Sequence, residues 1–426
     1  MEEIYMQRSL RTWLFLPVLL SLALVVAACE ADDDATDDVV DTDDTEIVED
    51  TDDATDDAVV DDEDDAATDD EEAVVEDDGD DAVAEDDDAE ATDDADEVAD
   101  EGDYPDVNEL IGGDIIFGDF NWDSAMFHNR VAQFIIEEGY GHQTDVLPGS
   151  TLPILQGLED NDIHAVTEMW VQNMPEWYHE EVEAGTYHDL GSNYVGAIQG
   201  WFVPTYVIEG DEERGIEPLA PDLSHVDDLA DVWEVFEDEE DSSMGRVYNG
   251  VGGWEATEIN DVRLRSYGLD EYYNSFLPGS EAALFASLAR EYDRGEPWIG
   301  YLWTPSWPFA EYELTFIEEP EYTEECWEEV SAAAQEQGTV DEACGFPEVD
   351  VNVVVSTELN EHAPHLVDFL TAYESDMELT NAALLYISEN DATPEEAAEW
   401  WLMEYEDVWT AWVSDDVAQR VMDALQ

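Results

Sequence analysis

Three tryptophans in this chain share one local context, and indole rings in that context could bind a cation. Trp303 follows the apolar run 297–302 and precedes a turn at Pro305. Trp122 and Trp170 also follow strand-like segments and precede helix-like ones. Ligands of open α/β sheets bind beyond the carboxyl ends of the strands, so these rings are placed for a ligand. Facing indoles attract a quaternary ammonium group by cation–π contact, each contributing roughly 0.5–2 kcal/mol once water is excluded.

Core packing is the competing interpretation of these rings. The chain holds 15 Trp residues, and most Trp side chains in a globular domain pack in its core. The shared placement at strand ends is the feature that favours a cage.

A glycine turn supplies a second candidate site. The segment Gly250-Val251-Gly252-Gly253 precedes a helix predicted from Trp254 to about Gly268, and free backbone N–H groups at a helix start can bind an anion. A phosphate loop would need a following Lys, and the chain has none, so a carboxylate is the simpler guest. A plain structural turn is the alternative. A cage and an amide site together predict that the ligand is a small zwitterion with a methylated ammonium group and a carboxylate.

Two sheets flanked by helices must position these residues. Strand, helix and strand alternate from Asp114 to Glu168, which indicates a parallel sheet covered by helices. The apolar segment 197–207 contains Pro204, which a central strand rarely tolerates, so we interpret it as a crossover between lobes. The β-branched run 349–355 then returns the chain to the first lobe.

The predicted fold class is therefore α/β with two lobes, joined by a two-segment hinge that closes on a ligand. Residues 105–207 and 346–426 are expected to form lobe 1, and residues 208–345 are expected to form lobe 2.

The N-terminus predicts an extracytoplasmic lipoprotein. Arg8 and Arg11 precede the apolar run 13–28, which closes with small residues directly before Cys29. This pattern indicates a lipoprotein signal peptide over residues 1–29, with a diacylglycerol on Cys29 that holds the protein at the outer face of the cytoplasmic membrane. A soluble secreted protein is the alternative.

Acidic residues dominate the rest of the chain. From 30 to 104, 42 of 75 residues are acidic and none is basic, which predicts a disordered tether, with weak binding of divalent cations as the alternative. The folded part carries 72 acidic residues against eight Arg and no Lys. Nucleic acid and anionic membrane surfaces are thus excluded as partners, because both need basic patches. So many carboxylates also make any paired-carboxylate motif uninformative.

Two cysteines remain after the lipid site. Cys326 and Cys344 form an even pair in an oxidising location, which predicts a disulfide that contributes roughly 3 kcal/mol by loop closure. Free thiols or a metal site are the alternatives, but no His or further Cys lies nearby in sequence. We expect no metal and no cofactor.

From about Gly112 onward, the chain resembles the substrate-binding proteins of glycine betaine and proline betaine ABC importers. The resemblance rests on Trp-Asp-Ser at 122–124, Trp170 with Asn173, the Gly252-Gly253 turn with Thr257, and Trp303-Thr304-Pro305-Ser306-Trp307 followed by Phe309 and Tyr312. It implies a type II periplasmic-binding fold, delivery of the ligand to a membrane permease, and osmoprotection. It also implies a cage of Trp122, Trp170 and Trp303, with the carboxylate held by the amides of Gly252 and Gly253.

The sequence departs from that family at two positions. Some members have a carboxylate-binding His where this chain has Pro175, and Trp254 stands where an apolar residue is usual and could add a further wall. Choline, carnitine or another betaine is therefore an alternative ligand.

Two rival functions use the same residues. A secreted hydrolase would use Asp123 or Glu168 as its catalytic carboxylate and the Trp rings as a sugar platform. A carbohydrate- or wall-binding lipoprotein is the rival without catalysis. No motif in a fitting context supports catalysis, and His362 and His365, three residues apart on a predicted helix, are expected to be a surface pair.

The excess of acidic residues yields the first prediction. A domain this negative repels itself at low ionic strength, and concentrated salt screens the repulsion by shortening the Debye length to about 3 Å. We expect the melting temperature of the protein to fall as salt is withdrawn. A melting temperature that does not change between dilute buffer and molar salt contradicts this prediction.

Overall fold

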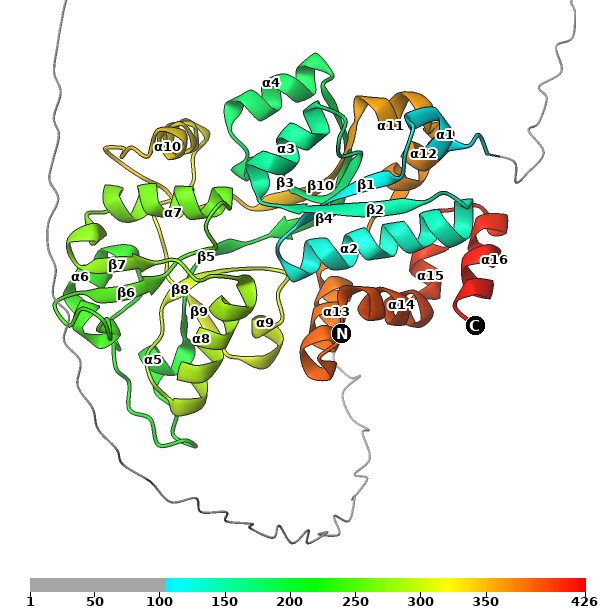
Figure 1. Cartoon of the computed structure of the whole chain (residues 1–426). Helices are drawn as coiled ribbons and strands as arrows, with labels where there is room; N and C mark the ends of the chain where they lie inside the picture. The colour runs from blue at the N-terminus through cyan, green and yellow to red at the C-terminus, as the bar shows by residue number, and fades with distance from the viewer. Residues whose placement is uncertain (1–103) are drawn as a thin grey trace, which may run out of the picture. The chain divides into compact units, whose positions relative to one another are not determined.

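The computed structural model describes residues 104–426, so the predicted signal peptide, the lipid site at Cys29 and nearly all of the tether lie outside the described residues. The described part forms two five-stranded sheets flanked by helices (Figure 1). None of the helices in this part is long and apolar enough to span a membrane.

The first sheet contains strands from both ends of the described chain. Its order is β2 (Thr144–Gly149), β1 (Ile115–Phe120), β3 (Ala165–Trp170), β10 (Val349–Ser356) and β4 (Tyr187–Ala197). β1 runs parallel to β2 and β3, whereas β10 runs antiparallel to β3 and β4.

The second sheet repeats this plan. Its order is β7 (Tyr273–Phe276), β6 (Gly245–Tyr248), β8 (Gly300–Trp303), β5 (Gln199–Pro204) and β9 (Leu314–Phe316). β6 runs parallel to β7 and β8, and β5 runs antiparallel to β8 and β9.

Both sheets are thus mixed, and the expectation of a parallel sheet is wrong for the crossing strands. β5 and β10 each enter a sheet after the chain has left the other one, and both run against their neighbours. The interpretation of residues 197–207 as a crossover is wrong for 199–204, which are β5. Pro204 is tolerated there because it is the last residue of the strand. The chain passes from the first sheet to the second at residue 198, between β4 and β5, whereas the first segment of lobe 1 was predicted to end at residue 207. The lobe boundaries stay a prediction.

Helices cover the faces of both sheets. α3 and α4 lie on one face of the first sheet and α2 lies on the other, while α7 and α8 lie on opposite faces of the second sheet (Figure 1). The helices are α1 (Val107–Ile111), α2 (Asp123–Phe134, continued by a π-helical turn at Ile135–Tyr140), α3 (Thr151–Glu159), α4 (Glu176–Ala184), α5 (Thr205–Glu209), α6 (Leu229–Val232), α7 (Glu255–Ser266), α8 (Glu281–Arg294), α9 (Pro308–Glu311), α10 (Glu324–Glu336), α11 (Thr357–His362), α12 (Pro364–Ala372), α13 (Met377–Asn390), α14 (Pro394–Glu404), α15 (Glu406–Trp409) and α16 (Asp415–Ala424), with short 3-10 turns at Val171–Asn173, Val226–Asp228, Trp233–Phe236 and Leu269–Glu271.

The spacing of apolar residues explains why α2 packs as it does. Phe127, Val131 and Ile135 recur every four residues, lie on one face, and are fully buried against α14 and the first sheet. The helix therefore fixes the direction in which the chain leaves β1, and with it the position of Trp122.

The predicted disulfide is present. Cys326 on α10 bonds to Cys344, 18 residues later, beside a small apolar cluster that includes Ile259 and Val262 of α7. The bond ties α10 to the segment that follows it, and both pack against α7, the helix that begins next to Trp254.

Candidate functional site

Four tryptophans stand where strands meet the following helix or turn. Trp122 follows β1 and precedes α2, and Trp170 is the last residue of β3. Trp254 precedes α7, and Trp303 is the last residue of β8. The parallel pairs β1/β3 and β6/β8 point their carboxyl ends at one gap, so the four rings meet there.

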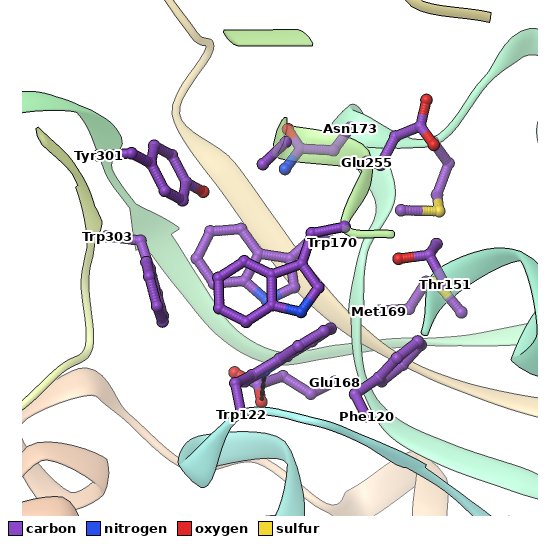
Figure 2. Close-up of a pocket in the computed structure, with 13 residues that line it drawn as sticks. Phe120, Trp122, Thr151, Glu168, Met169, Trp170, Asn173, Glu255, Tyr301 and Trp303 are labelled. Carbon is purple, nitrogen blue, oxygen red and sulfur yellow. Dashed lines mark hydrogen bonds between the residues drawn. The ribbon is translucent and has the colours of Figure 1, made fainter. Parts of the chain in front are cut away.

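The rings line one pocket. Its walls are Phe120, Trp122, Thr151, Glu168, Met169, Trp170, Asn173, Met174, Trp254, Glu255, Ala256, Tyr301 and Trp303. The empty space among them is about 440 Å³, including the part that opens to solvent. Figure 2 shows the side chains of Trp122, Trp170 and Trp303 pointing toward a common centre, with Tyr301 beside Trp303. The structure brings Trp122, Trp170 and Trp303 together around one pocket.

Trp254 connects the two sides of the pocket. Its ring centroid lies 5.5 Å from that of Trp122 and 5.1 Å from that of Trp303, at interplanar angles of 80° and 89°. Its Nε1 donates to Asn121 Oδ1 at 2.6 Å. Phe120 and Tyr301 back the outer walls, stacked on Trp122 and Trp303 at 4.5 Å and 5.5 Å. These rings leave aromatic faces and edges as the main lining of the space.

A buried carboxyl group lies under this cage. Glu168, on β3, accepts hydrogen bonds from Trp122 Nε1 at 2.9 Å, from Ser124 Oγ at 2.9 Å and from the hydroxyl of Tyr194. Burial raises the pKa of Glu168 to about 7, although the hydrogen bonds from these donors oppose the rise. The Trp-x-Ser pattern at 122–124 thus has a physical role, since both side chains hold the same carboxyl group.

A second carboxyl group joins the two sides of the pocket. The backbone N–H of Asp123, at the start of α2, donates to Glu281 Oε2 on α8 at 2.7 Å. Glu281 is buried, and burial together with the neighbouring Asp123 raises its pKa well above the usual range. Burial also raises the pKa of Asp123. Asp123 thus contacts Glu281 through its backbone N–H and is not among the residues that line the pocket.

A third carboxyl group lines the pocket itself. Glu255 is the first residue of α7, is 6% exposed, and accepts a hydrogen bond from Gln335 on α10. Burial raises the pKa of Glu255 to about 7. The hydrogen bond from Gln335 lowers this pKa, and the negative charge of the nearby Glu258 raises it further. Sequence reasoning missed Glu255, because a carboxylate is unremarkable in so acidic a chain.

The glycine turn lies beside the pocket but does not line it. Gly252 and Gly253 are exposed, whereas the next residues of the chain, from Trp254 to Ala256, form part of the wall. Gly253 has φ +93°, and a Cβ there would meet Ser150 at 2.9 Å, so close packing against the first lobe explains this glycine. The role of these two amides as a carboxylate site stays a prediction.

The remaining candidate residues lie elsewhere. Pro175 precedes α4 and does not line the pocket. His365 is not a simple surface residue, since its Nε2 lies 3.0 Å from Nε2 of His142 and its ring stacks on Tyr104. In residues 104–426, no group of three or more His, Cys, Asp or Glu could hold a metal ion.

The buried carboxyl of Glu168 gives a pH prediction. Its folded pKa of about 7 lies above the unfolded value of 4.5, so the folded chain keeps a proton that the unfolded chain releases. This stabilisation is fully present below about pH 4.5 and is lost as pH rises through 7, at about 1.4 kcal/mol per pKa unit. We expect Glu168→Gln to flatten the rise in melting temperature between pH 7 and pH 5.

Glu183→Gln, at an exposed position on α4, makes the same charge change and serves as the control. Equal pH slopes for the wild type and Glu168→Gln contradict the prediction.

Comparison with known proteins agrees with this geometry. The family model for the substrate-binding domain of ABC-type glycine betaine transport systems matches residues 113–404. A trimethylamine N-oxide-binding protein of Pelagibacter ubique is 22% identical over 296 residues, which is 70% of this chain and 89% of the relative.

Solved structures show the same fold. A glycine betaine and L-proline binding protein from Borrelia burgdorferi superposes with a TM-score of 0.57 at 19% identity, covering 72% of this chain and 99% of that one. A choline-binding protein in complex with choline gives 0.56 at 18% identity, covering 73% and 98%. The fold is thus the two-lobed α/β type II periplasmic-binding-protein fold, as predicted.

The matched family consists of extracytoplasmic transport receptors rather than enzymes, so the hydrolase alternative is set aside. The chain belongs to the family of substrate-binding proteins of ABC-type glycine betaine transport systems, which serve importers of betaine- and choline-type compounds.

Proposed function

We propose that this protein captures glycine betaine or a related quaternary ammonium compound and delivers it to an ABC permease for osmoprotectant uptake. A lipid on Cys29 would hold it at the outer face of the cytoplasmic membrane. Choline or carnitine as the ligand is the alternative within the same fold. A carbohydrate receptor is the alternative from another class.

One observation carries the proposal: four indoles, three at or just after strand ends and one at the start of α7, line one small pocket. Trp122, Trp170, Trp254 and Trp303 are each less than a tenth exposed, so a ligand among them would be largely dry. A quaternary ammonium group has no hydrogen-bond donors and needs none here, since aromatic faces supply the attraction. A sugar would need many polar partners, and the lining offers mostly rings and methionines.

Buried carboxyl groups add to the attraction for a cation. Glu168 lines the pocket directly, and Glu281 lies behind it near Asp123. In a dry site a carboxylate attracts a positive charge far more strongly than it does in water. The ligand's ammonium group would therefore gain both cation–π and charge interactions.

Contacts across the pocket support closure of two halves on the ligand. Trp254 and Asn121 join the second half to the first, and so does the bond between Trp327 Nε1 and the backbone oxygen of Gln172 at 2.8 Å. Such bonds form only when the halves meet, so they favour the arrangement in which the cage is complete.

Calorimetry with glycine betaine, choline, carnitine and a neutral sugar tests the proposal. Binding of at least one methylammonium compound, with no response to the sugar, is the expected result. Binding of the sugar alone contradicts it.

We expect Trp303→Ala to weaken binding of the tightest methylammonium ligand by more than about tenfold, the scale of one lost cation–π wall. Trp303→Phe should recover part of the loss, and Trp177→Ala, at an exposed ring on α4 outside the pocket, should change nothing. Unchanged affinity in a folded Trp303→Ala variant would mean that this indole serves packing only.

A further inference from the structure

The charges that line the pocket are of one sign. Glu168 and Glu255 are its two ionisable acids, and within the described chain no Arg, Lys or His belongs to its wall. A ligand carboxylate placed here would meet one of these carboxyl groups without a basic partner. A ligand that is only cationic would meet two groups of opposite charge.

Four neutral donors of the wall, those of Tyr301, Asn173, Trp122 and Trp254, are already engaged with the protein, which leaves Trp170 and Thr151. Tyr301 Oη donates to Gln199 Oε1 at 2.8 Å, and Asn173 exchanges hydrogen bonds with the amide of Gln199 at 3.1 and 2.9 Å. Trp122 Nε1 donates to Glu168, and Trp254 Nε1 donates to Asn121. A ligand carboxylate, which needs several donors, would have to break these bonds.

Two other places for a ligand carboxylate lie outside the wall or beside an acid. The exposed amides of Gly252 and Gly253 are outside the wall. The N-terminus of α7 does reach the wall, but its first residue is Glu255, so an acidic side chain already stands at the positive end of the helix.

Glu255 is a buried acid in the wall of the pocket. It has a partner in Gln335, which donates from α10 and holds the carboxyl group in place. It follows Trp254 directly, so the carboxyl group and a cage wall are set by the same helix start. Thr151, the first residue of α3, also lines the pocket, and its hydroxyl can donate or accept.

We propose that Glu255 makes the pocket selective for a methylated ammonium alcohol, a ligand with a net positive charge and a hydroxyl group in place of a carboxylate. This inference rests on the proposed function and narrows it. The ammonium group lies among the indoles near Glu168, and the hydroxyl donates to Glu255. A betaine puts its own carboxylate where the hydroxyl would be, against the carboxyl group of Glu255.

Calorimetry on the full chain at pH 8, where both pocket acids are largely ionised, tests the inference. The probes are choline, glycine betaine, carnitine and trimethylamine N-oxide at one salt concentration. Carnitine keeps a hydroxyl and adds a carboxylate, and the N-oxide carries no net charge. We expect choline to bind at least about tenfold more tightly than each of the others.

Glu255→Gln separates selectivity from folding. The amide keeps the size of the side chain, and we expect the preference for choline over glycine betaine to shrink by at least about fivefold. Glu258→Gln changes the same charge on the same helix but outside the wall, and should leave the preference unchanged. The ratio of two affinities is the readout, because a merely structural defect would weaken both ligands together.

The results that would contradict the role of Glu255 differ from those that would contradict the proposed function. If glycine betaine, carnitine or the N-oxide binds as tightly as choline, or if Glu255→Gln leaves the preference unchanged, the assignment to Glu255 is wrong while the proposed function stands. If none of the four compounds binds, the proposed function fails as well. Should Glu255→Gln not fold, the wild-type order of affinities still decides.

Discussion

Two pairs of parallel strands end at one gap, and this constraint decides what the rest of the structure can do. β1 and β3 deliver Trp122 and Trp170 from one side, and β8 and the start of α7 deliver Trp303 and Trp254 from the other. No single lobe contains the whole cage. The site therefore exists only where the two halves meet, which couples ligand capture to the relative position of the halves.

Burial of acids without basic partners is the second feature of the site. Glu168, Glu255 and Glu281 are each at most 6% exposed, and burial raises the pKa of all three. Elsewhere, buried acids have basic partners, as where Arg130 holds Asp119 at 2.8 Å. Leaving acids unpaired costs stability in the empty protein. A bound cation would offset that cost, so the same groups that weaken the empty fold strengthen binding.

The sequence indicated the aromatic lining of the pocket, but of its two acids it singled out only Glu168, and that as a candidate catalytic carboxylate. Three of the rings could be found because each follows a strand-like segment, and Trp254 because it departs from the family pattern after the glycine turn. The Cys326–Cys344 bond could be found from an even pair of cysteines. Glu255 could not, because with 72 acidic residues in the folded part nearly every spacing of carboxylates occurs by chance. Only burial distinguishes it from its neighbours.

Some strands of the fold could also be predicted from the sequence, and others could not. The strands β1, β3, β8 and β10 coincide with apolar runs and were predicted, with small differences at their ends. β4 was missed because Gly191 and Gly196 and several polar residues interrupt its pattern, and β9 because it is only three residues long. The antiparallel entry of β5 and β10 depends on the path of the chain between sheets, which local sequence does not encode.

We infer that this pocket recognises the positive charge of a methylated group rather than its apolar surface. The most direct measurement compares the affinity of choline with that of 3,3-dimethylbutan-1-ol, in which carbon replaces the ammonium nitrogen at nearly the same shape. Contributions of up to about 2 kcal/mol per desolvated ring predict that the neutral alcohol binds at least about tenfold more weakly. Equal affinities for the two alcohols would contradict the account.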